Sequence, residues 1–385
     1  MTQRADRMNA IQPFHVMALL ARARELEAAG RSIIHMEIGE PDFVTPQPVI
    51  DAGVRALAEG RTHYTPAVGL AALRERISLF YRERYGVDVD PRRIVVTPGA
   101  SAALQLVMAV LVNPGDAVLM ADPGYPCNRN FVYLLNGEPL GLPVDAATDY
   151  QPDPAQVAAA WTQATRALLV ASPANPTGTL LSPRALGKLY DVVKGHDGSL
   201  VVDEIYHGLT YAAPAHTALA VSEDIFVVNS FSKYFGMTGW RLGWLVAPQD
   251  CVADIDKLAQ NLFLAAPTLA QYAALSAFEP ENIAILEQRR EAFRQRRDYL
   301  LPALRELGFA IPVTPEGAFY LYAGCSRFTD DSYRFTGQLL EEAGVAITPG
   351  IDFGTHQPER HVRFAYTTSL ENLEEGVRRL REYLG

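Results

Sequence analysis

The stretch N-S-F-S-K-Y-F-G-M-T-G-W-R-L-G-W, Asn229 to Trp244, lies between two short apolar runs, Ile225–Asn229 and Leu242–Ala247. Runs of this kind, without strict polar and apolar alternation, are typical of strands that are covered on both faces. The stretch therefore predicts a loop at the end of a buried strand, and this loop carries a lysine, Lys233, and an arginine, Arg241.

Apolar runs recur earlier in the chain, with helical segments between them: Ile94–Thr97, Ala117–Ala121, Ala167–Ala171 and Leu200–Asp203. This alternation of strands and helices predicts an α/β fold, with a large, mostly parallel sheet covered by helices on both faces. Ligands of such sheets bind beyond the carboxyl ends of the strands. Candidate site residues occur at those positions: Ser101, Asn175, Asp203 and Lys233.

The two ends of the chain predict a smaller α/β domain. Before the large sheet, the expected elements are helices at Pro13–Gly30, Pro46–Ala58 and Leu70–Tyr85 and a strand at Ile33–Ile38. After Leu264, they are Leu269–Phe278, Ile283–Leu307, Ala318–Tyr322, Ser332–Ala343, His361–Tyr366 and Leu370–Tyr383. We therefore expect an N-terminal arm and the first part of the small domain in residues 1–45. The large domain would take residues 46–282, and the C-terminal small domain residues 283–385.

The composition excludes several classes of protein. The chain has 385 residues and a net charge of −10, without a run of lysines or arginines, which argues against a nucleic acid or an anionic membrane surface as partner. Three widely spaced cysteines, Cys127, Cys251 and Cys325, predict no disulfide framework and favour a reducing, cytoplasmic location. We find no secretory signal, no membrane-spanning run and no histidine pattern typical of a metal site.

The surroundings of Lys233 predict a cofactor. Two serines, Ser230 and Ser232, and a guanidinium, Arg241, suit a phosphate dianion. A lysine amine forms a Schiff base with an aldehyde. Pyridoxal phosphate carries both groups on one small ring. The alternative, that Lys233 is a solvated loop lysine, requires the rest of the chain to offer no matching groups.

A second phosphate-binding segment is the turn Gly99, Ala100 and Ser101, which follows the strand Ile94–Thr97 and begins a helix. A strand, a turn of small residues and a helix together present free backbone N–H groups to a phosphate. The segment has neither a GxxxxGK nor a GxGxxG pattern, so a nucleotide cofactor receives little support.

Two residues match the ring of this cofactor. Asp203, in V-V-D-E-I-Y, ends an apolar strand, where a carboxylate is costly unless it is paired. It suits the protonated ring nitrogen, which the cofactor needs to accept electrons. Tyr206 follows three residues later, within reach of the phenolic oxygen of the ring. The alternatives are an aspartate at a turn and a core tyrosine.

Three further residues have the same two interpretations. Asn175, in S-P-A-N-P-T-G, can donate to the phenolic oxygen, and Tyr125, in D-P-G-Y-P, can stack on the ring, although both sit in ordinary turn sequences. Arg363, in H-V-R-F-A-Y, lies within an apolar strand, where a guanidinium needs an anion. We predict that it grips a substrate carboxylate, and a structural carboxylate partner is the alternative.

The motifs together resemble the class I/II aminotransferases of the fold-type I pyridoxal phosphate enzymes, and the resemblance covers nearly the whole chain. They are I-G-E-P-D-F, H-Y-T-P-A-x-G, S-P-A-N-P-T-G, V-D-E-I-Y, S-F-S-K-x-F-G-M-T-G-W-R-L-G and V-R-F. The resemblance implies a homodimer with active sites at the subunit interface. It implies that Tyr64 reaches the cofactor phosphate of the partner subunit. It also places Gly39 beside the substrate carboxylate, with Arg363.

The resemblance implies transfer of an α-amino group from an amino acid to a 2-oxo acid by a ping-pong mechanism, with Lys233 as tether and proton carrier. Ser101 stands where some bacterial aspartate aminotransferases of this branch carry a lysine for a distal carboxylate. We therefore expect a neutral or aromatic donor, with 2-oxoglutarate or pyruvate as acceptor. One alternative is a lyase of the same fold, such as a C–S β-elimination enzyme. Another is a regulatory module, for which the segment before I-G-E-P-D is short and not very basic.

Overall fold

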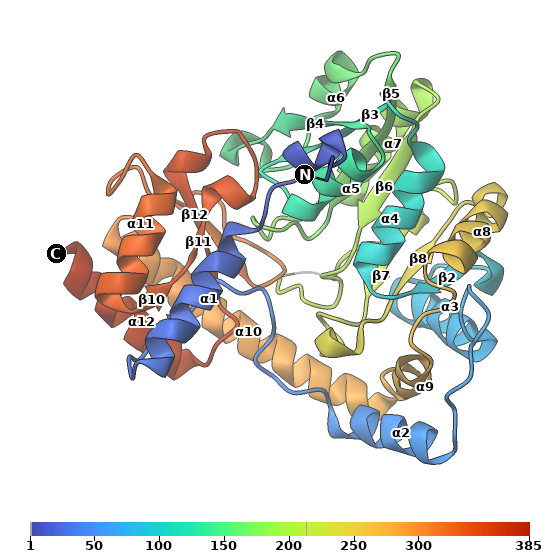
Figure 1. Ribbon diagram of the computed structural model, residues 1–385, viewed down its shortest axis with the longest axis horizontal. Helices are drawn as coiled ribbons and strands as arrows, with labels where there is room; N and C mark the ends of the chain where they lie inside the picture. The colour runs from blue at the N-terminus through green and yellow to red at the C-terminus, as the bar shows by residue number, and fades with distance from the viewer. Residues whose placement is uncertain (1, 213) are drawn as a thin grey trace.

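The computed structural model describes residues 2–212 and 214–385, so residue 1 of the expected N-terminal arm and residue 213 of the expected large domain lie outside the described residues. A seven-stranded sheet forms the larger lobe, in the order β2-β8-β7-β6-β5-β3-β4 (Figure 1). Its strands are β2 (Ile94–Thr97), β3 (Ala117–Asp122), β4 (Glu138–Pro143), β5 (Thr165–Ala171), β6 (Ser199–Asp203), β7 (Phe226–Ser230) and β8 (Gly243–Val246). β8 runs antiparallel to both of its neighbours, β2 and β7, and the other pairs of strands are parallel. The predicted α/β fold class is confirmed.

Helices bury both faces of this sheet, as the apolar runs predict. Successive residues of β6, such as Val201 and Val202, point into two different core clusters. One cluster includes α4 (Ala100–Leu111) and α8 (Val252–Leu262). The other includes α3 (Ala71–Tyr85) and α7 (Pro183–Gly195). The remaining helices of this lobe are α2 (Gln47–Ala58), α5 (Pro126–Leu134), α6 (Pro154–Ala160) and α9 (Thr268–Ser276).

The smaller lobe combines both ends of the chain. Its three-stranded sheet has β12 (His361–Ala365) between β11 (Thr348–Pro349) and β9 (Tyr320–Gly324), and β1 (Ile34–His35) pairs in parallel with β10 (Val345–Ala346). The helices are α1 (His15–Ala28), α11 (Ser332–Gln338) and α12 (Leu370–Leu384). The pairing of β1 with β10 explains how the N-terminal segment joins this lobe. The domain boundaries at residues 46 and 283 stay a prediction.

Three expected elements differ from the structure. The strand expected at Ile33–Ile38 is only two residues long as β1, although the Met36 N–H still donates to the Ala346 carbonyl. The strand expected at Ala318–Tyr322 starts two residues later as β9, because Ala318 has a φ of +57°. The helix expected at Ser332–Ala343 ends as α11 at Gln338, and a single π-helical turn continues to Ala343.

The long helix α10 (Pro280–Leu307) connects the two lobes (Figure 1). Its Arg296 is buried and donates two hydrogen bonds to the Asp42 carboxylate, at 2.8 and 2.9 Å, and one to the Thr367 carbonyl. Paired hydrogen bonds of this kind fix geometry as well as charge. This contact holds the segment that follows β1 against the helix, and so fixes one wall of the space between the lobes. Within residues 2–212 and 214–385, none of the helices is long and apolar enough to cross a membrane.

Candidate functional site

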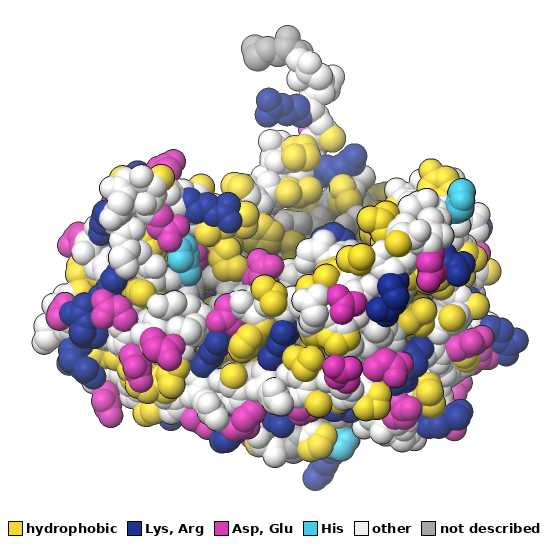
Figure 2. Space-filling model, turned by 90° about the horizontal axis from the view of Figure 1, so that it is seen from below, with side chains coloured by type: hydrophobic (Ala, Val, Ile, Leu, Met, Phe, Trp, Pro, Cys, Tyr) yellow, Lys and Arg dark blue, Asp and Glu magenta, His cyan; other side chains and the backbone are white. Residues whose placement is uncertain are grey.

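A cavity of about 540 Å³ opens between the two lobes, at the carboxyl ends of β2, β5, β6 and β7. Figure 2 shows this face of the molecule, with a hollow between the lobes and the N-terminal arm standing clear of the body. Most of the residues predicted from the sequence line this cavity: Gly39, Ala100, Ser101, Tyr125, Asn175, Asp203, Tyr206, Ser230, Ser232, Lys233, Arg241 and Arg363. The prediction that a ligand binds beyond the strand ends therefore matches the position of the cavity.

One end of the cavity contains groups that suit an anion. The buried hydroxyl oxygens of Ser230 and Ser232 lie 2.9 Å apart, next to the N-terminus of α4, where backbone N–H groups are free. Gly99 does not line the cavity, but it has a φ of +79°, and a Cβ there would lie 2.7 Å from Nη2 of Arg241. The glycine therefore allows the guanidinium to approach the start of α4, where a dianion would meet hydroxyls, N–H groups and a positive charge.

Lys233 lies between this anion site and the smaller lobe. Its Nζ donates a hydrogen bond of 2.6 Å to the Gly39 carbonyl. Burial lowers the pKa of Lys233 to about 8, and the positive charges of Arg363 and Arg241 add to this effect. About a tenth of the amine is therefore uncharged at pH 7, far more than for an ordinary lysine, and the uncharged amine is the form that attacks an aldehyde.

Asp203 lies at the carboxyl end of β6 and is 5% exposed. Its Oδ1 accepts a 3.0 Å hydrogen bond from the Ile205 N–H. Burial raises the pKa of Asp203 to about 6, against the opposing effect of Lys233. A buried carboxylate with this environment favours a cationic partner, and a protonated ring nitrogen would meet that need.

Arg363, on β12, is 5% exposed and is held by neutral oxygen atoms. Nη1 donates to Oδ1 of Asn175 at 3.0 Å, and Nη2 donates to the Glu37 carbonyl at 2.6 Å and to Oγ1 of Thr348 at 3.2 Å. These partners orient the guanidinium without neutralising it. An incoming carboxylate would therefore meet a fixed and uncompensated charge.

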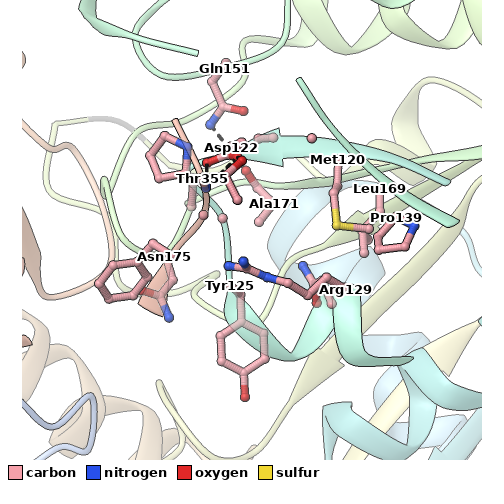
Figure 3. Close-up of a pocket in the computed structure, with 18 of the residues that line it drawn as sticks. Met120, Asp122, Tyr125, Arg129, Pro139, Gln151, Leu169, Ala171, Asn175 and Thr355 are labelled. Atoms are coloured by element: carbon pink, nitrogen blue, oxygen red, sulfur yellow. Dashed lines mark hydrogen bonds between the residues drawn. The ribbon is translucent and has the colours of Figure 1, made fainter. Parts of the chain in front are cut away.

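Tyr125, Ala171 and Asn175 also line a second cavity of about 110 Å³ (Figure 3). The Arg129 guanidinium extends into the smaller cavity, whereas the Tyr125 ring points away from it. Nη2 of Arg129 donates a 3.1 Å hydrogen bond to the Asp352 carbonyl. Tyr125 directly precedes α5 and lines the larger cavity.

Several lining residues have no signal in the sequence. Helix α1 supplies an apolar wall through Val16, Met17 and Leu20, and the N–H groups of His15 and Val16 bind the carboxylate of Asp352. Further lining residues that the motifs do not indicate are Phe14, Arg24, Glu37, Tyr320, Thr348 and Phe353. They come from segments more than 300 positions apart, and no spacing rule connects such segments.

Tyr64 is not among the lining residues and is 82% exposed. Its position therefore does not connect it to the cavity of its own subunit. Among the residues that the structure describes, no three histidine, cysteine, aspartate or glutamate side chains are arranged to hold a metal ion.

Residues 31–380 match the family model of aminotransferase class I and II. The chain is 38% identical to the valine–pyruvate aminotransferase of Mycobacterium tuberculosis over 386 residues, covering 100% of this chain and 99% of the relative. It is 36% identical to the (5-formylfuran-3-yl)methyl phosphate transaminase of Methanocaldococcus jannaschii, over 99% of both chains. A crystal structure of an aminotransferase from Mycobacterium tuberculosis superposes with a TM-score of 0.96, at 38% identity, over 100% and 99% of the two chains.

Proposed function

The chain belongs to the class I and II aminotransferases, which use pyridoxal phosphate, and on this premise we propose its substrates and the roles of its residues. The reaction we propose transfers the α-amino group of a neutral or aromatic amino acid to 2-oxoglutarate or pyruvate, in ping-pong order. The observation that carries the proposal is one cavity that contains Lys233, Asp203 and Arg363 together with the apolar wall of α1.

The residues of the cavity fit the cofactor. Its phosphate would bind to the hydroxyls of Ser101, Ser230 and Ser232, the N–H groups of Gly99 and Ala100 and the Arg241 guanidinium. Its ring would lie between Tyr125 and the strand ends, with Asp203 at the ring nitrogen and Tyr206 and Asn175 at the phenolic oxygen. When bound, the cofactor supplies the electron sink for the Cα–H bond that breaks.

We assign the catalytic roles to Lys233, Asp203 and Tyr206, of which the last two act on the cofactor ring, and the binding of the substrate to Arg363. Arg363 pins the α-carboxylate, with Gly39 and Asn175 beside it, and so holds the Cα–H bond in the orientation that favours its cleavage. Lys233 would then remove the proton at Cα and deliver it to C4′ of the cofactor, acting as general base and then as general acid. A pKa of about 8 suits this role, because both protonation states are populated near neutral pH.

The donor preference rests on the cavity wall. Phe14, Val16, Met17 and Leu20 offer apolar surface to a substrate side chain, and Ser101 offers no cation for a distal carboxylate. Arg24 of α1 also lines the cavity, and it is the cation that the distal carboxylate of 2-oxoglutarate would meet. A C–S β-elimination lyase would use the same central residues. The two activities are separated by their products, since a lyase releases pyruvate and ammonia without consuming a 2-oxo acid.

We further propose a homodimer in the cytoplasm, with Tyr64 reaching the cofactor phosphate of the partner subunit. The support is the exposure of Tyr64 (82%) and of other apolar side chains, Val44, Val54, Leu57 and Leu262. Such exposed apolar side chains are typical of surfaces that another chain covers.

The test replaces Lys233 by alanine. We expect the variant to lose the cofactor absorbance that depends on the covalent bond, and to lose at least about a thousandfold in kcat with a panel of amino acids and 2-oxoglutarate. Lys257→Ala is the control, because Lys257 is exposed and pairs with Asp254 on the surface. Full activity and unchanged absorbance of Lys233→Ala would disprove the assignment.

A further inference from the structure

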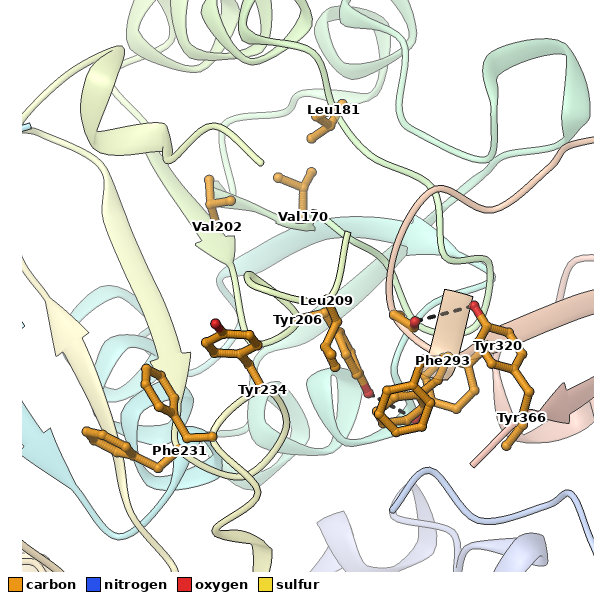
Figure 4. Close-up of a cluster of buried hydrophobic side chains, with 14 of the residues drawn as sticks. Val170, Leu181, Val202, Tyr206, Leu209, Phe231, Tyr234, Phe293, Tyr320 and Tyr366 are labelled. Atoms are coloured by element: carbon orange, nitrogen blue, oxygen red, sulfur yellow. Dashed lines mark hydrogen bonds between the residues drawn. The ribbon is translucent and has the colours of Figure 1, made fainter. Parts of the chain in front are cut away.

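The hydroxyl groups of two buried tyrosines meet at the boundary between the lobes. Tyr206, which follows β6 of the seven-stranded sheet, and Tyr320, the first residue of β9, have their phenolic oxygens 2.9 Å apart. The two side chains are 4% and 1% exposed. Figure 4 shows both among the buried side chains of this region.

Packing fixes the Tyr320 hydroxyl in position. The Arg363 guanidinium lies 4.2 Å from the centre of the Tyr320 ring, a distance typical of a cation–π contact. On the other side, a Cβ on Gly39 would lie 1.9 Å from the Tyr320 oxygen. Only glycine at position 39 therefore leaves room for this hydroxyl. The ring of Tyr206 meets that of Tyr320 edge-on, with centroids 5.7 Å apart.

The number of protons on the two hydroxyls determines which tyrosine donates the hydrogen bond and which accepts it. A phenol has one proton to donate, and its oxygen also accepts. If Tyr206 donates its proton to the phenolic oxygen of the cofactor, the short contact with Tyr320 is satisfied only when Tyr320 donates to Tyr206. A donor to the Tyr206 oxygen also strengthens the bond that Tyr206 donates onward, because hydrogen bonds in a chain polarise one another.

We propose that Tyr320 is a positioning residue, which directs the Tyr206 proton toward the cofactor and supports the Arg363 guanidinium with its ring. This inference rests on the proposed cofactor site. The Tyr320 hydroxyl strengthens the hydrogen bond from Tyr206 to the phenolic oxygen of the cofactor. The Tyr320 ring holds Arg363 in the position that binds the substrate carboxylate. One side chain of the smaller lobe thus contacts both the carboxylate-binding arginine and the phenol beside the cofactor.

Tyr320→Phe removes the hydroxyl and keeps the ring. We expect the pH at which the absorbance of the bound cofactor changes to rise by roughly half a unit, because the phenolate form of the cofactor loses part of its stabilisation. Asp203, Lys233 and Arg363 also face this phenol pair and are unchanged in the variant. We expect kcat to fall about threefold to tenfold and KM for the amino acid to stay within about twofold, since the ring still packs on Arg363.

Tyr320→Leu tests the other half of the proposal, because it removes the ring as well. We expect KM for the amino acid to rise about fivefold or more relative to Tyr320→Phe, since the guanidinium loses its stacking partner. Equal KM values for the two variants would overturn the role of the ring.

A double variant separates action through Tyr206 from a general effect. Tyr206→Phe should raise the midpoint by about one unit, and Tyr206→Phe with Tyr320→Phe should raise it no further. Tyr366→Phe is the matched control, since Tyr366 is a fully buried tyrosine of the same lobe whose hydroxyl binds the Ala318 carbonyl at 3.3 Å. It should leave the midpoint unchanged.

The inference is overturned if Tyr320→Phe leaves the midpoint at the wild-type value, or if its shift adds fully to that of Tyr206→Phe. A different outcome bears on the proposed function itself. If Tyr206→Phe also leaves the midpoint unchanged, the placement of the cofactor beside Tyr206 is wrong, and the role of Tyr320 falls with it.

Discussion

Asp203 is a residue whose cost to the fold can be measured. Because burial raises its pKa from 3.8 to about 6, the folded cofactor-free protein binds a proton more tightly than the unfolded chain does. The stability from this group is present at low pH and is lost as the pH rises from about 4 to 6. Above that window, the buried carboxylate destabilises the cofactor-free fold by about 3 kcal/mol.

We therefore predict that Asp203→Asn stabilises the cofactor-free protein at pH 8 in urea unfolding, while the added stability from pyridoxal phosphate decreases. Asp90→Asn is the control of opposite sign. The Arg92 guanidinium and N–H lower the pKa of Asp90 to about 2, so its replacement should not stabilise. A cofactor-free Asp203→Asn variant that is less stable than wild type at pH 8 would contradict the prediction.

Candidate site residues could be identified from the sequence where the residues next to them in the chain indicate a strand end. Asp203 ends an apolar strand and Lys233 follows one, so each is marked locally. Tyr320 carries no such mark, because its importance comes from a hydroxyl 114 positions away along the chain and from the absence of a side chain at Gly39.

At the scale of an element, the start of α4 gives a direct test of the anion site. Gly99→Ala should weaken the binding of pyridoxal phosphate about tenfold or more, because the new Cβ displaces the Arg241 guanidinium. The backbone strain at φ +79° and ψ 170°, a conformation that is essentially restricted to glycine, should in addition cost about 1–3 kcal/mol of stability. Both effects are measured on the cofactor-free protein, by absorbance titration with the cofactor and by urea unfolding.

Gly115→Ala is the matched control for this variant. Gly115 has a similar φ of +86°, but a Cβ there meets nothing within 4 Å. We expect a loss of stability from the positive φ without a loss of cofactor affinity. If the two variants bind the cofactor equally well, contact between Gly99 and Arg241 does not shape the site.

Strands were predictable from the sequence where both of their faces are buried, because such strands consist of a continuous apolar run, as in β5 and β6. The edge strand β4 went unpredicted, because its sequence, E-P-L-G-L-P, contains two prolines and a glycine. Such residues are tolerated only where one side of the strand needs no partner. Helix α8 also went unpredicted, since it buries only Ile255 and Ala259 and the rest of its sequence mixes polar and apolar residues.

For the whole molecule, the proposed exchange of Tyr64 between subunits predicts complementation. Tyr64→Ala and Lys233→Ala should each have little activity alone. After subunit exchange in an equal mixture, half of the dimers are hybrids and each has one intact site, so about a quarter of the wild-type activity should return. Activity is measured before and after exchange, at constant total protein.

The matched mixture combines Asp203→Ala with Lys233→Ala. Both residues line the same cavity of one chain, so a hybrid of these two variants has no intact site and should recover nothing. If the Tyr64→Ala mixture also recovers nothing although hybrids form, Tyr64 does not act across the interface.

The meeting of the lobes was only partly predictable. The sequence locates the cavity, because the carboxyl ends of parallel strands share one edge of a sheet. It does not reveal the opposite wall, since β1 and β10 pair Ile34 with Val345 across more than 300 positions. Each of these strands has only two residues, which is too short for its sequence to predict the pairing.

The wall that α1 contributes has an evolutionary meaning. The groups proposed to hold the cofactor stand at strand ends in the middle of the chain, whereas Val16, Met17 and Leu20 come from one helix near the N-terminus. If α1 contacts the substrate as proposed, mutations in that helix change which amino acid the enzyme accepts and leave the residues around the cofactor unchanged. A duplicated gene would need few such changes to acquire a new substrate, and relatives of this chain with very different named substrates share more than a third of its sequence.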